Sequence, residues 1–251
     1  MSVDLIVKEN GGLPLLTFPG LAGLAGLTHA VTTRHGGVSA PPRDSLNLAP
    51  AGDAPPAVAA NLARLRRALG LTRLVWASQV HGTRILAVRD QDGVVGEADG
   101  LATDQPGVGL LIKQADCQAV ILAAPERGVV ACLHVGWRGN VADMPGQGVR
   151  FLARRFGVAP GELWAAVSPG LGACCAEFVN HAREFPPEFR DFRRQGDNFD
   201  LPAITRAQLA RAGVAPERIE LAEMCTKCRP EFFSYRREGE TGRSGTVVAL
   251  V

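Results

Sequence analysis

Two residues that could do chemistry lie in one apolar stretch, residues 115–140, with the sequence ADCQAVILAAPERGVVACLHVGWRGN. Cys117 opens the first apolar run, and His134 lies near the end of the second. A thiolate and an imidazole can bind a metal ion together, or they can act as a nucleophile and its base. Either role requires the fold to bring the two side chains to one place.

The turn sequence PERG joins the two runs and predicts a β-hairpin. If this loop places Ala124 opposite Val129, then His134 lies opposite Ala119, two residues from Cys117. Residues two apart share a face of a strand, so Cys117 and His134 become diagonal neighbours with Cβ atoms about 7 Å apart. This separation suits two ligands of one metal ion. A register slip of one residue would place them on opposite faces.

A third candidate ligand is His81, which lies in SQVHG at the end of a predicted strand, where the turn at Gly82 exposes it. Two His and one Cys suit zinc, and three protein ligands leave one position open, as in catalytic zinc sites. A single Cys or His on an apolar strand is more often a core residue. The metal prediction therefore rests on the three residues together.

Four further cysteines and Cys132 compete for the ligand role. Cys132 lies two residues before His134 and shares its face, so a different register would favour it. Cys225 and Cys228 form C-x-x-C, which is a weak zinc or redox signal because no second C-x-x-C follows. The adjacent pair Cys174–Cys175 is predicted to be structural.

The elements that must position these residues alternate between strands and helices. Strands are predicted in LTHAVTT, in 74–88 with a break at His81, in VGLLIK, in both hairpin runs, in LWAAVSP, in IELAEMC and in TVVALV. Helices are predicted over 57–69, 146–156 and 202–212, and residues 33–56 are predicted to be a long loop. The pattern indicates a single α/β domain, residues 1–251, with mixed β-sheets and packed helices.

Composition excludes several classes of function. The net charge is +2 and 46% of the residues are hydrophobic, so neither nucleic acid nor membrane is a predicted partner. We find no signal peptide and no apolar run of about 18 residues, which predicts a soluble, cytoplasmic protein with reduced cysteines. The sequence makes no prediction of the oligomeric state.

An ordered set of motifs covers nearly the whole chain and resembles the laccase-domain family. Its members are also called multicopper polyphenol oxidases and, more recently, purine nucleoside phosphorylases. The motifs are TTRHGGVS, SLNL, SQVHG, EADG, ADC, HVGWRG, SPGLGACC, RAQLARAGV, and CT followed by FFSYRREGETGR.

The resemblance implies that His81, Cys117 and His134 are both metal ligands and catalytic residues. It implies an α/β fold with one zinc per chain, phosphorolysis of adenosine, inosine, guanosine and methylthioadenosine, and deamination of adenosine. The sequence departs from the family pattern near these ligands at Lys113, Gln114 and Ser168, and Cys228 is additional. The three ligands themselves are unchanged.

Phosphate and nucleoside are the partners that this reading requires. Arg34 and Arg138 are the predicted phosphate ligands, because the guanidinium fork matches phosphate oxygens. Arg34 lies in the Gly-rich turn TRHGG, where backbone N–H groups can also face an anion. Asn47 is predicted to hydrogen-bond ribose or base.

Three other functions would use residues of the same His2Cys group. A four-copper oxidase needs about ten histidines, whereas the chain has five and no H-x-H pair. The alternative that remains is a copper-dependent polyphenol oxidase in which one copper ion replaces zinc in the His2Cys site. A thiol hydrolase would use Cys117 as nucleophile and His134 as base. A binding module would keep zinc for structure alone, which the open coordination position disfavours.

Overall fold

The hairpin predicted around PERG forms the middle of a sheet. In the computed structural model, which describes residues 1–251, strand β10 (Gln118–Ala124) pairs antiparallel with β11 (Val129–Val135). Ala124 lies opposite Val129 and Ala119 lies opposite His134, which is the predicted register. Gly128 closes the connecting 3-10 turn at φ 61°, a left-handed conformation that glycine adopts without steric cost.

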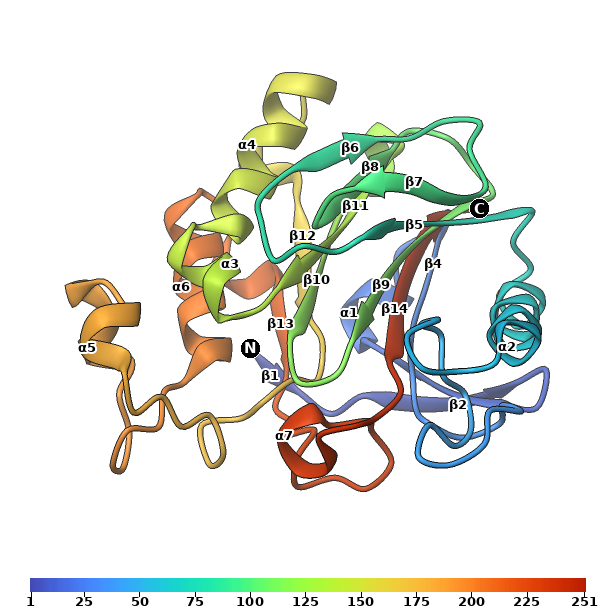
Figure 1. Ribbon diagram of the computed structural model, residues 1–251. Helices are drawn as coiled ribbons and strands as arrows, with labels where there is room; N and C mark the ends of the chain where they lie inside the picture. Colours follow the sequence, from blue (N-terminus) through green and yellow to red (C-terminus); the bar gives the residue numbers. More distant parts are fainter.

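Two seven-stranded sheets make up the fold (Figure 1). The first sheet has the order β1 (Ser2–Val3), β13 (Ile219–Ala222), β12 (Trp164–Val167), β10, β11, β8 (Gly100–Thr103) and β6 (Ile85–Ala87). The second has the order β2 (Ile6–Asn10), β3 (Leu13–Thr17), β4 (Leu27–Thr32), β14 (Ser244–Leu250), β9 (Val108–Gln114), β5 (Arg73–Ser78) and β7 (Gly93–Glu97). Both sheets contain parallel and antiparallel pairs, so the predicted mixed α/β fold is confirmed.

Three of the seven helices, α2, α4 and α6, cover the outer faces of the two sheets. The helices are α1 (Pro19–Ala22), α2 (Pro55–Ala68), α3 (Trp137–Val141), α4 (Met144–Phe156), α5 (His181–Glu184), α6 (Leu201–Arg211) and α7 (Tyr235–Glu238). The three long ones, α2, α4 and α6, match the predicted helices to within two residues at each end. Short 3-10 segments lie at Pro125–Arg127, Pro160–Glu162, Pro187–Phe192 and Pro216–Arg218. No helix is long and apolar enough to cross a membrane.

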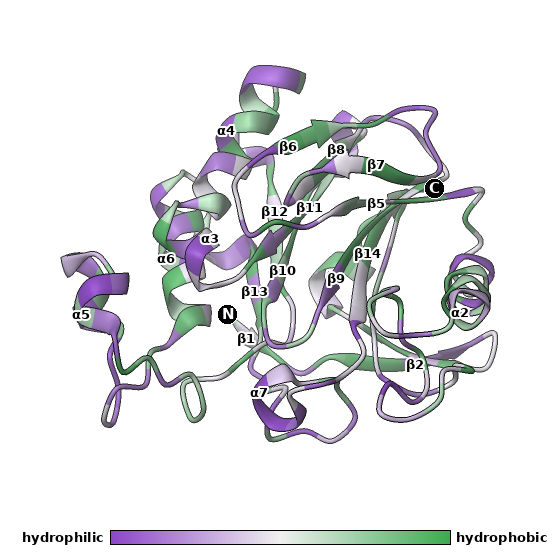
Figure 2. Cartoon of the chain, viewed as in Figure 1, coloured by the Kyte–Doolittle hydropathy of each residue, from purple (hydrophilic) through white to green (hydrophobic).

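The largest apolar core lies between the two sheets. It combines side chains of both, such as Ile121 and Cys132 from the first and Ile112 and Val248 from the second. A second core packs α4 and α6 on the outer face of the first sheet, and a third packs α2 on the second sheet. Strands β10 and β11 are therefore buried on both faces, which explains their continuous apolar runs. Figure 2 shows the central strands in green and polar purple on the surrounding helices and loops.

Three successive connections cross from the second sheet to the first: β5 to β6, β7 to β8, and β9 to β10. Strand β5 is parallel to both β7 and β9, so the three connections leave the second sheet at the same end. His81 lies in the first connection, Asp99 in the second and Cys117 in the third. This edge of the molecule collects the residues of the candidate site.

Candidate metal centre

The three predicted ligands converge. The nitrogen atoms of His81 and His134 and the sulfur of Cys117 all lie within 4.8 Å of one another. The two imidazole rings meet edge to face, with centroids 4.8 Å apart. His134 is buried, Cys117 is half-buried and His81 is exposed, so the group is closed toward the core and open toward solvent.

Asp99 orients both histidines. Its buried carboxylate accepts a hydrogen bond from Nδ1 of His134 at 2.8 Å. It also accepts bonds from the backbone N–H groups of Val80, His81 and Gly82, at 3.2, 2.9 and 2.7 Å. The first contact directs Nε2 of His134 toward the site, and the others hold the turn that carries His81. Carboxylates in this position fix the tautomer of metal-binding histidines.

Charge within the group is strongly coupled. Burial alone would raise the pKa of Cys117, but the charge and hydrogen bond of His134, together with His81, lower it to about 6. Burial alone would lower the pKa of His134, but Cys117 and Asp99 raise it to about 9. Hydrogen bonds from His134 and Gly82 outweigh burial and lower the pKa of Asp99. The site therefore stabilises a thiolate, the form of cysteine that binds metal ions.

The backbone around the site adopts unusual conformations. His81 and Asp116 have φ values of 60° and 83°, in the left-handed region that side chains other than glycine seldom occupy. The Asp116 carboxylate accepts bonds from Thr226 Oγ1 and from the backbone N–H of Arg236, both at 2.6 Å. These bonds anchor the bend that presents Cys117. Asp116 thus positions the chain.

The remaining histidines and Cys132 lie outside the group. Cys132 is fully buried between the sheets, and burial raises its thiol pKa, so it has the properties of a core residue. His29 accepts a bond from the Phe18 N–H, and His181 pairs with Asp197.

A zinc ion with ligand bonds of about 2.0–2.3 Å requires donor atoms about 3.3–3.8 Å apart. The His81, Cys117 and His134 donors fit this requirement with small side-chain adjustments.

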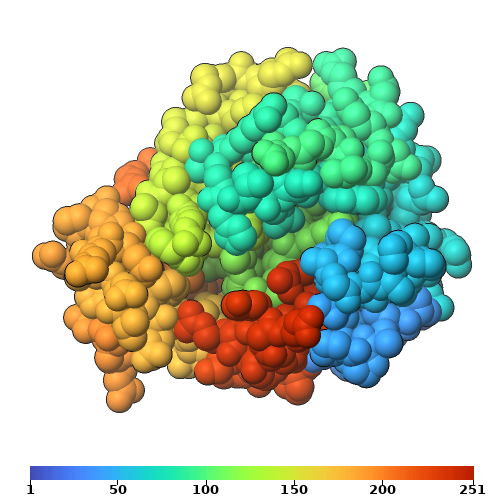
Figure 3. All heavy atoms as spheres, in the orientation of Figure 1, coloured from blue at the N-terminus to red at the C-terminus, as the bar shows by residue number.

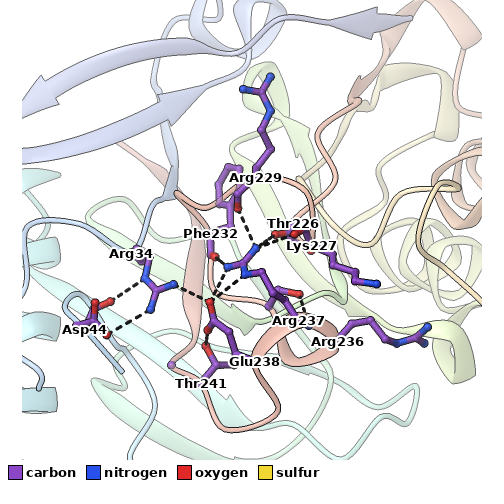
Figure 4. Close-up of polar contacts among 12 residues, drawn as sticks. Arg34, Asp44, Thr226, Lys227, Arg229, Phe232, Arg236, Arg237, Glu238 and Thr241 are labelled. Atoms are coloured by element: carbon purple, nitrogen blue, oxygen red, sulfur yellow. Dashed lines mark hydrogen bonds and ion pairs between the residues drawn. The ribbon is translucent and has the colours of Figure 1, made fainter. Parts of the chain in front are cut away.

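Arg34 is held by carboxylates (Figure 4). Its Nη1 donates to Glu238 at 2.7 Å, and its Nε donates to the Asp44 carbonyl at 2.8 Å. The guanidinium also lies over the Phe233 ring, 4.7 Å from the centroid. Binding of phosphate by Arg34 would require it to exchange one of these partners.

Asn47 is fully engaged inside the chain. Its amide donates to the Ala49 carbonyl and to Asp53, and its carbonyl accepts from the N–H groups of Ala49 and Arg243. A direct contact with a nucleoside would have to replace one of these bonds. The structure instead shows Asn47 holding the backbone at Arg243.

Arg243 is a site residue that sequence reasoning did not single out, although it ends the TGR motif. Burial lowers the pKa of its guanidinium, and the nearby charges of Cys117 and Asp116 act to raise it. Its Nη1 donates to the carbonyls of Thr241 and Gly242, and its Nε and Nη2 have no partner. The signal that could have found it is an arginine in the same motif set as the ligands.

Arg138 is exposed at the start of α3, four residues after His134. Its guanidinium stacks on Trp137, 4.3 Å from the ring centroid, and makes no ion pair. In Figure 3 the teal, yellow-green and red segments, which include the β5–β6 connection, α3 and α7, border a hollow with a green floor. A cavity of about 650 Å³ lies elsewhere and is lined by Leu5, Leu16 and Met224 among others.

Comparison with known proteins gives this geometry a family context. A family model described as multi-copper polyphenol oxidoreductase laccase matches residues 28–251. The chain belongs to this family. A protein of Deinococcus radiodurans named purine nucleoside phosphorylase is 39% identical over 250 residues, covering 95% of this chain and 94% of its own. Purine nucleoside phosphorylase YlmD of Geobacillus stearothermophilus is 36% identical over 242 residues, covering 87% and 88%.

Solved structures agree with this membership of the laccase family. The crystal structure of YlmD from Geobacillus stearothermophilus superimposes with a TM-score of 0.89 at 32% identity, covering 98% of this chain and 99% of that one. The Bacillus licheniformis protein YfiH gives a TM-score of 0.86 at 28% identity, covering 97% of each chain. The two-sheet arrangement is thus shared by relatives along almost their full length.

Proposed function

We propose that this chain is a purine nucleoside phosphorylase that holds one zinc ion with His81, Cys117 and His134 and also deaminates adenosine. The observation that carries the proposal is the His2Cys group, oriented by Asp99 and open to solvent on one side. Relatives named purine nucleoside phosphorylases support the substrate class. Copper is the expected substitute for zinc, because imidazole and thiolate ligands bind it tightly.

In phosphorolysis a phosphate oxygen forms a bond to the anomeric carbon, the bond between that carbon and the purine nitrogen breaks, and the purine takes up a proton. In deamination, water adds at C6 of adenine and ammonia leaves. A zinc ion in this site supplies a Lewis acid that can polarise an oxygen atom or activate water. The chain itself must hold the phosphate and keep the histidines in the correct tautomer.

Phosphate binding is assigned first to Arg138, whose guanidinium has no carboxylate partner, and then to Arg243, whose Nε and Nη2 are free. Arg34 is a third candidate, and it would have to exchange Glu238 or Asp44. Asn47 acts on the nucleoside through Arg243, whose N–H it holds at 2.8 Å. A charge-assisted hydrogen bond to phosphate contributes about 1.5–3 kcal/mol.

The test is incubation of purified protein with adenosine, inosine, guanosine and methylthioadenosine, with and without phosphate, followed by chromatography. We expect phosphate-dependent release of a ribose phosphate and the free purine. Arg138→Ala should lower phosphorolysis by about tenfold to a hundredfold and deamination much less. Arg155→Ala is the matched control, because Arg155 also stacks on an aromatic ring, Phe156, but lies on α4. Release of free ribose without phosphate would mean that the enzyme is a hydrolase.

One observation favours a second candidate. Without a metal ion the lowered pKa of Cys117 and the raised pKa of His134 give a thiolate–imidazolium pair, which is also the resting state of thiol hydrolases. Protein purified without added metal distinguishes the two. Rapid alkylation of Cys117 in metal-free, hydrolytically active protein would favour the hydrolase, and zinc-bound protein with protected Cys117 favours the phosphorylase.

A further inference from the structure

Four cysteines form a second group of potential ligands, apart from the first. The sulfur atoms of Cys174, Cys175, Cys225 and Cys228 all lie within 4.8 Å of one another. Cys228 Sγ is 3.6 Å from Cys174 Sγ and 3.5 Å from Cys175 Sγ. The C-x-x-C motif therefore does have a second pair of cysteines, supplied by the adjacent residues 174–175 rather than by another C-x-x-C.

The separations match a tetrahedral metal site. Zinc–sulfur bonds of about 2.3 Å place the sulfur atoms of a four-thiolate site about 3.8 Å apart. The two Sγ–Sγ distances to Cys228 are close to this edge. A disulfide would need two of these sulfur atoms to approach to about 2.05 Å, and the distances to Cys228 are well above this value.

Two irregular segments supply these cysteines, and their backbones are already joined. Thr226 N–H donates to the Gly170 carbonyl at 2.9 Å, and Gly170 N–H donates to the Met224 carbonyl at 3.3 Å. Within the second segment, the Cys228 N–H donates to the Cys225 carbonyl at 3.1 Å, which closes a tight turn. This arrangement presents both sulfur atoms of the C-x-x-C turn to the 174–175 pair.

Gly172 lets the first segment pass close to Cys225. A Cβ atom at Gly172 would lie 3.0 Å from the Cys225 Cβ and 3.6 Å from the Cys174 Sγ. Only glycine allows the first segment to approach this closely.

Positive charge lies around the group. Four thiolates and one divalent zinc carry a net charge of −2, and Lys227 lies in the C-x-x-C turn. The Arg236 guanidinium donates to the carbonyls of Cys175 and Glu177 at 3.2 Å. In Figure 4 the side chains of Lys227, from the C-x-x-C turn, and Arg236, from α7, both extend to the right. These cations offset the charge of a zinc tetrathiolate.

We propose that Cys174, Cys175, Cys225 and Cys228 bind a structural zinc ion in a closed tetrahedral site. Binding releases the four thiol protons and involves no oxidation. The ion joins two segments that have no regular secondary structure. Because Thr226, next to Cys225, bonds to Asp116, next to Cys117, it also stabilises the border of the first site.

The zinc content of purified protein, measured by mass spectrometry of the metal, tests the proposal. The wild type should contain two zinc ions per chain. The double variant Cys225→Ser/Cys228→Ser should contain one, and Cys117→Ser should contain one. Cys132→Ala is the matched control, since Cys132 belongs to neither group, and it should keep two. A double variant with the same zinc content as the wild type would overturn the proposal, as would iron in place of zinc.

A second measurement covers the case in which the double variant does not fold. Cys117→Ser protein loaded with Co²⁺ should show the intense sulfur-to-cobalt charge-transfer bands of a tetrathiolate site, and their absence would contradict the assignment.

A third measurement tests for disulfides. After denaturation in the presence of a chelator and without reductant, all six cysteines should react with an alkylating agent. Two or four unreactive cysteines would show disulfides and overturn the proposal. Neither readout depends on turnover of a nucleoside, so the zinc proposal can succeed or fail independently of the proposed function.

Discussion

Glycine at position 136 makes room for the Cys117 sulfur. A Cβ atom at this position would lie 2.9 Å from Cys117 Sγ and 3.4 Å from His81 Cδ2. We expect Gly136→Ala to displace the thiolate and lower zinc affinity at least tenfold, a typical cost of disturbing the groups around metal ligands. Competition with a chromogenic chelator measures this. Gly139→Ala is the control, because its Cβ would meet neighbours only at 3.6 Å. Equal zinc affinity in all three proteins would remove Cys117 from the ligand set.

His29 makes stability depend on pH. Its Nε2 accepts a bond from the Phe18 N–H at 2.8 Å, and burial, with a smaller contribution from Lys8, lowers its pKa to about 4. The folded state thus favours neutral His29. Its contribution is fully present above pH about 6.5 and is lost as the pH falls toward 4, by about 3 kcal/mol.

Urea denaturation at pH 7 and pH 4.5 measures this loss. His29→Gln should have a smaller drop in the free energy of unfolding between the two pH values than the wild type. His35→Gln, at an exposed position, should keep the wild-type drop. An identical pH dependence in the His29 variant and the wild type would show that His29 is not the titrating group.

For single residues, the sequence predicts which side chains form the candidate site better than it predicts their hydrogen-bond partners. The set of His81, Cys117 and His134 follows from their chemistry and from one hairpin register. Asp99 does not, because an aspartate in a loop gives no sign that three backbone N–H groups and one imidazole will converge on it. Gln114 and Ser168, two departures from the family pattern, turn out to be hydrogen-bonded to each other at 2.8 Å. Only the fold shows that these two departures form a pair.

Among the elements, the long loop 33–54 is held to the C-terminal segment by Arg34. Arg34 bonds to Glu238, and Arg237 bonds to Glu238 and to the carbonyls of Thr226, Lys227, Arg229 and Phe232 (Figure 4). Arg34→Ala should therefore lower the free energy of unfolding by about 2 kcal/mol and reduce phosphorolysis and deamination by similar factors. Thermal denaturation and the two activity assays measure this.

Arg66→Ala provides the reference for the Arg34 variant. Arg66 makes only a long ion pair with Asp92, 3.4 Å, on the surface, and such pairs contribute about 1 kcal/mol or less. A loss of phosphorolysis alone in Arg34→Ala, with stability and deamination kept, would instead make Arg34 a phosphate ligand.

Local elements were predictable because their signals are local. The β10–β11 hairpin and helices α2, α4 and α6 follow from turn residues and from helical periodicity. The crossovers between sheets were not predictable, since strands β5 and β6 are consecutive in the chain but belong to different sheets. The candidate metal centre lies at these crossovers, so its three side chains could be named from the sequence while the contacts that support them could not.

For the whole molecule, the arrangement of histidines limits the copper chemistry that the chain can support. The chain has five His. Two groups of side chains could hold a metal ion: one contains His81 and His134 with Cys117, and the other contains four cysteines and no histidine. His29 lies in β4 and accepts a bond from the Phe18 N–H, and His181 lies in α5 and pairs with Asp197. A trinuclear copper cluster with a separate electron-entry copper cannot be assembled from these ligands.

Oxidase activity on phenols should consequently be weak and should rise with added copper, because one copper ion in the His2Cys site can exchange single electrons with a phenol. Zinc has no accessible redox change, so zinc-loaded protein should be inactive in a phenol oxidation assay while it still cleaves inosine with phosphate. His134→Ala should abolish the copper-dependent oxidation, and His181→Ala should leave it unchanged. Robust phenol oxidation by protein that contains zinc alone would contradict this account, since neither the zinc site nor the four-cysteine group offers a path for the electrons.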